Sequence, residues 1–310
     1  MRRLTAGSLA CVVAAASCAR RAGPTRLDIV IGFGSSGQAS AEWLAVLQKR
    51  LPPSAYDSVA PIRKPLTTEE AEWIALIHER APSWERMVAP LAALWRPASP
   101  PERVRIVLGN RGAEDAFTHD QRTVGFDLAA LQANYGGAGQ AGNGDRLDRF
   151  FRHEFTHLLQ KAWLPLYPWC DRSPLGIALL DIWAEGLGNY YSLSDRWVDR
   201  SGQLTSSARG TLTDLEPRLT AKLDTLARID SAAAGPVLAG LSSGPFAQKW
   251  GALPPALWLA SEPGPPDSAM RRFIVAGPAG VWDLADRHLP PSLRAALQDT
   301  RAAAARCRPR

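Results

Sequence analysis

The strongest chemical signal in the chain lies in Phe150–Gln160, which reads FFRHEFTHLLQ and contains His153-Glu154-x-x-His157. On an α-helix, residues four apart lie on one face about one turn from each other, so the two imidazoles can bind one cation. Glu154 lies to the side of that pair, where it can act as a general base on a water molecule. The pattern therefore predicts a hydrolytic metal site with His153 and His157 as metal ligands and Glu154 as the catalytic residue.

This chemistry requires a helix, and the flanking residues predict one. Apolar residues recur at helical spacing through residues 147–159. A turn at residues 143–144 precedes a candidate N-cap at Asp145, and Pro165 predicts that the helix ends at about Trp163. Two histidines on a solvated helix face are the alternative, which the apolar flanks disfavour.

A catalytic zinc site has three protein ligands and one open position. Glu185 is the best candidate for the third ligand among the acidic residues that follow. Its segment, residues 173–191, starts with Pro174, which suits the first turn of a helix. Gly186 and Gly188 are poor helix formers, but small residues would let this helix approach the histidine helix closely. The alternative is an ordinary exposed glutamate beside helix-breaking glycines.

The motif at His153–His157, followed by Glu185-Gly186, resembles the gluzincin branch of the zinc metallopeptidases. It is most similar to compact bacterial predicted zinc-dependent proteases that carry a Glu-Gly third-ligand helix. The resemblance covers roughly residues 100–195. It implies that Zn²⁺ is the cofactor, that Glu185 completes the ligand set, and that the substrate is a peptide or protein.

The same resemblance raises the question of which residue orients the ligands. In gluzincins of the thermolysin kind, an acidic residue one turn after the glutamate ligand orients a histidine. Here that position is Asn189, which supplies a hydrogen-bond acceptor but no charge. Asp181, one turn before Glu185, is the alternative.

The fold is predicted to be α+β and predominantly helical, with a zincin-like small sheet before the histidine helix. The 310 residues suffice for one large domain or two small ones. We expect a zincin-like catalytic domain over residues 27–199 and a helical C-terminal lobe over 200–310 packed on it. By resemblance to zincins, the sheet edge binds extended substrate, and Thr123–Phe126 is the predicted edge strand. The predicted strands are 27–33, 103–108 and 121–126, and the predicted helices include 40–51, one starting at Thr67, 84–95, 212–229 (with Pro217 in its first turn) and 290–305.

The N-terminal residues are typical of an export signal. Arg2-Arg3 is a basic start, and residues 4–16 form an apolar run too short to span a bilayer. Small residues precede Cys18, although the leucine usual three positions before the cysteine is missing. The pattern predicts a lipoprotein-type signal peptide over residues 1–17, a lipidated Cys18 and a linker over 18–26. The protein would then be periplasmic or an outer-membrane lipoprotein; plain secretion and a Tat signal are the alternatives.

Composition narrows the class of protein. Hydrophobic residues at 46% and charged residues at 21% are typical of a globular protein rather than a disordered one. The net charge of +6 comes from scattered residues without a basic run between aromatics, so no nucleic acid partner is implied. Apart from Cys11 in the signal and Cys18 at its end, the chain has only Cys170 and Cys307, which form one disulfide or remain two thiols.

Three functions fit these residues. The first is an envelope zinc metallopeptidase. The second is a metal-dependent hydrolase of another amide, such as a cell-wall peptide or an acyl amide, and the third is a non-enzymatic envelope protein with a vestigial metal site. An enzyme also needs a donor for the developing oxyanion, for which Tyr190, Tyr191, His288 and His119 are the candidates.

Lipidation gives the first test. Metabolic labelling with a fatty acid should mark the wild-type protein and not Cys18→Ser, because the thiol of Cys18 is the predicted attachment point. Absence of label on the wild type would contradict the lipoprotein prediction and leave simple secretion.

Overall fold

The computed structural model describes residues 25–111, 114–167, 169 and 172–305. The predicted signal peptide and the residues Cys18, Cys170 and Cys307 lie outside this range, so export, lipidation and disulfide pairing stay predictions. The described fold is α+β and predominantly helical, which confirms the class predicted from the sequence. None of the helices in this part of the chain is both long enough and apolar enough to cross a membrane.

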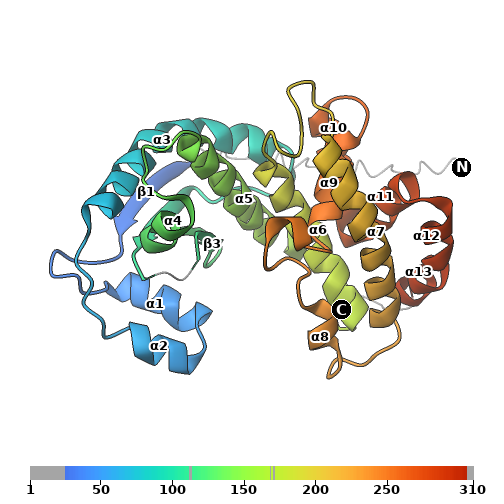
Figure 1. The fold of residues 1–310 in the computed structure, drawn as a ribbon, viewed down its shortest axis with the longest axis horizontal. Helices are drawn as coiled ribbons and strands as arrows, with labels where there is room; N and C mark the ends of the chain where they lie inside the picture. Colours follow the sequence, from blue (N-terminus) through green and yellow to red (C-terminus); the bar gives the residue numbers. More distant parts are fainter. Residues whose placement is uncertain (1–24, 112–113, 168, 170–171, 306–310) are drawn as a thin grey trace, which may run out of the picture.

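Four strands form one mixed sheet: β1 (Arg26–Ile31), β2 (Arg103–Gly109), β3 (Ala116–Thr118) and β4 (Thr123–Asp127). Their order in space is β1-β2-β4-β3. Figure 1 labels the two edge strands, β1 and β3. Strands β1, β2 and β4 run parallel, and β3 runs antiparallel to β4. The three predicted strands are thus confirmed, and β3 is an additional one.

The prediction that Thr123–Phe126 forms the sheet edge is wrong. Those residues belong to β4, which lies between β2 and β3 and is buried along its whole length. The edge strands of the sheet are β1 and β3, and β3 is the one next to β4. With three residues, β3 is too short to show the alternation that identifies a strand in a sequence.

The helices that precede residue 200 include two that the sequence did not predict, α2 and α4. They are α1 (Ala41–Arg50), α2 (Pro53–Val59), α3 (Thr68–Ala93), α4 (Leu128–Tyr135), α5 (Asn143–Trp163) and α6 (Pro174–Ser192), with a short 3₁₀ turn η1 (Leu164–Leu166). Helix α5 ends where predicted but begins at Asn143, before Asp145, because Gly142 takes the N-cap position with a φ of 87°.

Helix α3 is continuous where two helices were expected. Thr67 and Glu70 form a capping box at its start, as the sequence predicts. Pro82 and Pro90 both lie inside the helix. Trp84 between them is fully buried, so burial of one helix face outweighs the local preference of proline to interrupt it.

The C-terminal region is helical, as expected, with different boundaries. Its elements are α7 (Ser206–Leu226), α8 (Ala234–Leu238), η2 (Phe246–Gln248), α9 (Leu253–Ser261), α10 (Pro266–Ala276), η3 (Gly277–Ala279), α11 (Gly280–His288), α12 (Pro291–Ala296) and α13 (Gln298–Ala305). Thr205 caps α7 and starts it early, so Pro217 lies in its interior and not in its first turn. The helix predicted over 290–305 is interrupted at Leu297.

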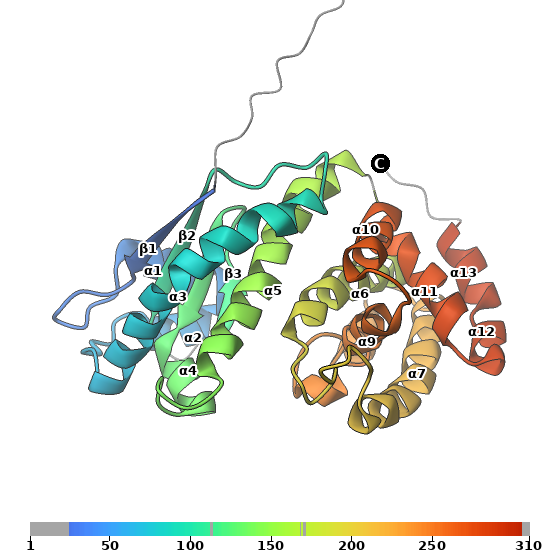
Figure 2. The ribbon, with the colours of Figure 1, turned by 90° about the horizontal axis from the view of Figure 1, so that it is seen from above.

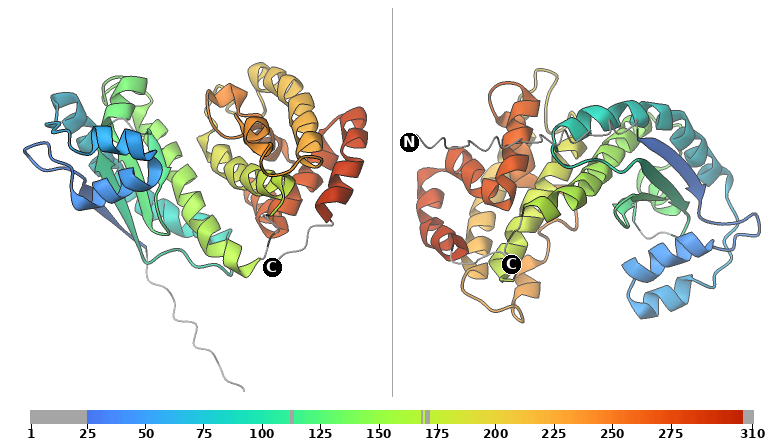
Figure 3. Two further views of the ribbon diagram at one scale, coloured as in Figure 1. Left: turned by 90° about the horizontal axis from the view of Figure 1, so that it is seen from below. Right: turned by 180° about the vertical axis from the view of Figure 1, so that it is seen from behind.

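Helices α5 and α6 join the sheet to the C-terminal helices. Helix α5 packs against α3, β3 and β4 and also against α6, which in turn packs against α7, α9 and α11. Figures 2 and 3 show α5 alongside the sheet and α6 among the C-terminal helices. The Trp84 ring stacks on Phe151 of α5 at 4.8 Å and on Phe126 of β4 at 5.7 Å. One buried apolar cluster therefore extends from the sheet through α5 and α6 into the C-terminal helices.

Candidate metal centre

Three side chains from α5 and α6 meet at one point. The Nε2 atoms of His153 and His157 lie 3.0 Å apart. The Glu185 carboxylate lies 3.7 Å from Nε2 of His153 and 3.6 Å from Nε2 of His157. In the part of the chain that the structure describes, this is the one group of three His, Cys, Asp or Glu side chains close enough to share a metal ion. The structure thus brings together the three predicted ligands, which come from two helices.

Gly188 allows α6 to come this close to α5. A Cβ atom at residue 188 would lie 2.9 Å from Cε1 and Nε2 of the His153 ring, closer than side chains pack. A Cβ at Gly186 would instead lie 2.7 Å from Cγ of Pro255 on α9. The sequence-based expectation that both glycines admit the histidine helix therefore holds for Gly188 only, and Gly186 serves the contact with the C-terminal helices.

Each imidazole is held through its second nitrogen. Gln160 Oε1 lies 2.7 Å from Nδ1 of His157, and Gln160 Nε2 donates to the Ala184 carbonyl at 2.7 Å. Because the amide nitrogen is the donor to Ala184, the amide oxygen must accept, so Nδ1 of His157 carries the proton. In the neutral tautomer that carries this proton, Nε2 of His157 presents its lone pair to the cluster. Nδ1 of His153 lies 3.0 Å from the Ser192 hydroxyl at the end of α6.

Neither residue expected to orient a histidine does so. The Asn189 side chain donates to the backbone carbonyl of Glu185 at 2.8 Å, and its Oδ1 has no hydrogen-bond partner among the described residues. Asp181 is exposed. Sequence reasoning missed Gln160 and Ser192. Gln160 could have been found from its spacing, because a residue three positions after His157 lies next to it on the helix surface.

Glu154 is buried beside the cluster, with one carboxylate oxygen 4.0 Å from Nε2 of His153. Its other oxygen accepts a hydrogen bond from the Thr118 hydroxyl at 2.7 Å. Burial raises the pKa of the Glu154 carboxyl, while His157 and the hydrogen bond from Thr118 oppose the rise. Thr118 is the last residue of β3, so the edge of the sheet touches the predicted general base.

Cations secure the end of β3. The backbone carbonyls of residues 118–120 accept, in order, from Arg50 at 3.4 Å, Lys49 at 3.2 Å and Lys161 at 2.9 Å. Two of these side chains come from α1 and one from α5, so the strand end is tied to both helices. Fixing the strand end fixes the Thr118 hydroxyl relative to Glu154.

The electrostatic setting favours neutral imidazole at His153. Burial lowers its pKa well below the ordinary value, and His157 and Lys249 lower it further. Neutral imidazole is the form that binds metals. Of the four oxyanion candidates, His288 instead contacts Glu262 at 2.8 Å, and Tyr190 and Tyr191 line a separate cavity. The fourth, His119, directly follows β3, and burial lowers its pKa.

The close approach at Gly188 gives a matched pair of variants. Gly188→Ala should displace the His153 ring and lower the affinity for Zn²⁺ or Co²⁺ by about 10- to 100-fold, the usual effect of disturbing what orients a ligand. Gly210→Ala on α7, where a Cβ would meet nothing within 4 Å, should leave metal affinity unchanged and stabilise the fold by up to about 1 kcal/mol. Chelator competition and thermal unfolding measure both, and wild-type metal affinity in Gly188→Ala would contradict the packing argument.

Comparison of the chain with protein-family models, with curated proteins and with solved structures finds no match. The case for a function therefore rests on this chain's own residues and on the geometry in which they meet.

Proposed function

We propose that the protein is a zinc-dependent metallopeptidase of the gluzincin kind. The observation that carries the proposal is the convergence of His153, His157 and Glu185 beside the buried carboxylate of Glu154. Two imidazole nitrogens and one carboxylate oxygen are a donor set that catalytic zinc uses. The proton on Nδ1 of His157, fixed by Gln160, supports this fit because it leaves Nε2 free. When bound, zinc polarises the substrate carbonyl and lowers the pKa of water from about 15.7 to about 7.

The remaining steps fall to the chain's own residues. Glu154 takes a proton from the attacking water and passes it to the leaving amine. Thr118 holds one oxygen of that carboxylate, which leaves the other turned toward His153. Because Thr118 ends β3, which is an edge strand, a peptide pairing with β3 in extended form would place its backbone next to Glu154. In this proposal the enzyme acts in the cell envelope, anchored through Cys18, or after secretion.

Replacement of the base separates an enzyme from a metal-binding scaffold. Glu154→Gln should fold, bind about one zinc per chain and lose peptide hydrolysis by about 10² to 10⁴ or more, because an amide cannot accept the proton. Glu185→Ala should lose most of the zinc. Hydrolysis of a peptide library and metal content are measured on the same samples.

The outcomes of that experiment differ for each function. Near wild-type cleavage by zinc-loaded Glu154→Gln would mean that Glu154 is not the base. Full zinc occupancy in Glu185→Ala would mean that the third ligand lies elsewhere. Inactivity of the wild type on every peptide would favour hydrolysis of another amide or a vestigial metal site.

The hydrogen bond from Thr118 gives a pH prediction. That bond lowers the pKa of Glu154, so its removal in Thr118→Val raises the pKa. Since the base acts only when ionised, the acid limb of the kcat/KM profile should move to higher pH in this variant. Thr118→Ser keeps the hydroxyl and should restore the wild-type profile. An unshifted limb in Thr118→Val would show that Thr118 does not act on the base.

A further inference from the structure

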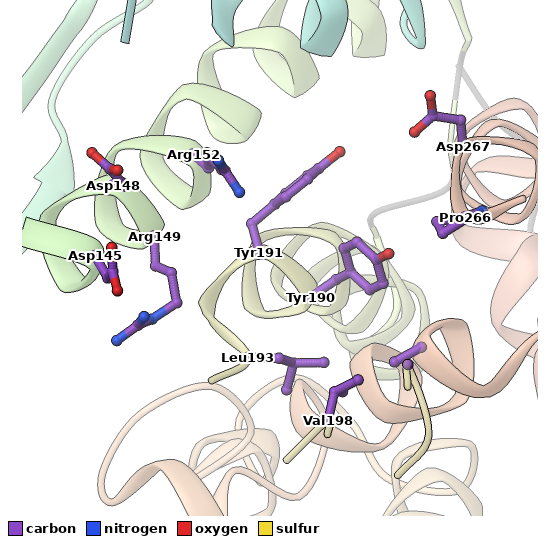
Figure 4. Close-up of a pocket in the computed structure, with 12 residues that line it drawn as sticks. Asp145, Asp148, Arg149, Arg152, Tyr190, Tyr191, Leu193, Val198, Pro266 and Asp267 are labelled. Atoms are coloured by element: carbon purple, nitrogen blue, oxygen red, sulfur yellow. The ribbon is translucent and has the colours of Figure 1, made fainter. Parts of the chain in front are cut away.

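A cavity of about 530 Å³ lies beside α5 (Figure 4). It is lined by the first half of α5, the end of α6 and the segment after it, α9 and the start of α10. Its lining does not include His153, His157 or Glu185. A volume of this size is in the range of sites for small molecules.

Two opposite charges in this cavity stand without partners. Among the described residues, neither Arg152 of α5 nor Asp267 of α10 has an oppositely charged side chain within ion-pair distance, and they do not reach each other. The only hydrogen bond of the Arg152 side chain in this part of the chain goes to the sulfur of Met87 at 3.2 Å, a weak acceptor. Arg152 is half-buried and Asp267 is exposed, so both side chains are accessible to a ligand that supplies the opposite charge.

One other charged group of the lining is already paired. Asp148 pairs with Arg80, and the Trp84 indole also donates to it at 2.7 Å. Arg149 and Asp145 lie at one end of the cavity in Figure 4, where the charge of Asp145 favours the charged form of Arg149. Arg152 and Asp267 are the two lining charges that act on Tyr191.

Two tyrosines lie between these charges. In Figure 4 the guanidinium of Arg152 points toward Tyr191, and Asp267 lies beyond the rings of Tyr190 and Tyr191. Burial and Tyr190 raise the pKa of Tyr191, with Asp267 adding to the rise and Arg152 opposing it, so this ring is within the field of both charges. Its hydroxyl stays protonated and can donate to a ligand. The apolar part of the cavity wall is formed by Leu193, Val198 and Ala260.

We propose that this cavity binds a small zwitterion, namely an amino acid or short peptide with free termini. The carboxylate pairs with Arg152 and the ammonium group with Asp267, and the apolar wall takes the side chain. The tyrosine hydroxyls lie along the path between the two charged ends. Binding at this site does not require the metal, so it can be tested independently of the proposed peptidase activity.

Calorimetric titration of the metal-free protein with the dipeptide Ala-Leu tests this site. Saturable binding is expected, and acetylation of the amine or amidation of the carboxylate should each weaken it about tenfold or more, because each removes one charge-assisted interaction. No saturable binding of Ala-Leu at millimolar concentrations overturns the proposal. Equal binding of either capped dipeptide overturns it as well, because one of the two charges would then be irrelevant.

Variants locate the binding. Arg152→Met and Asp267→Asn should each weaken Ala-Leu binding about tenfold or more. Arg86→Met, an exposed arginine on α3, is the matched control and should bind as the wild type does. Asp267 is exposed in the first turn of α10, so its variant keeps the test valid should Arg152→Met fail to fold. Binding that survives both cavity variants but is lost in Glu185→Gln would place the dipeptide in the metal cluster and overturn the proposal.

Discussion

The close approach of α5 to α6 at Gly188 is the constraint on which the candidate site depends. His153 and His157 need only a helix to come together, since they are one turn apart on α5. Glu185 must be brought to within 3.7 Å of them by tertiary packing. That packing has two parts, because Gly188 admits the His153 ring on one side of α6 and Gly186 admits Pro255 of α9 on the other. The C-terminal helices therefore position the third ligand even though they supply no ligand themselves.

The hydrogen bonds around the cluster fix the orientation of the ligand side chains, in addition to the close packing of α5 and α6. Gln160 binds His157 and the Ala184 carbonyl at once, so one side chain sets the imidazole tautomer and ties α5 to the residue before Glu185. Burial keeps His153 neutral and disfavours the charge on Glu154. A divalent cation at the cluster would offset the carboxylate charge that burial disfavours. The geometry and the electrostatics thus favour the same occupant.

The sequence was sufficient for the α+β class, for the strands β1, β2 and β4, and for the side chains that meet at the cluster. The strands follow from local periodicity. The cluster follows from a motif whose four-residue spacing places both histidines on one face of a helix. It was not sufficient for β3, whose three residues show no period, or for the unbroken α3, where burial of Trp84 overrides two prolines. The partners of the imidazoles were also missed, because whether Ser192 or Asn189 faces His153 depends on how α6 is rotated against α5. The domain boundary at residue 200 stays a prediction.

Three successive residues of α5 face three different surroundings. Glu154 contacts the sheet edge through Thr118, His153 contacts α6, and Arg152 lines the cavity. Arg152 and Tyr191 directly precede His153 and Ser192, whose 3.0 Å contact orients the first imidazole. A ligand that binds Arg152 and Tyr191 therefore contacts the residues next to His153 and Ser192, and it can shift the backbone that positions these two side chains. If such a ligand changes the affinity of the cluster for a metal, the metal must change the affinity of the cavity for that ligand by the same factor, because the coupling between two binding sites is reciprocal.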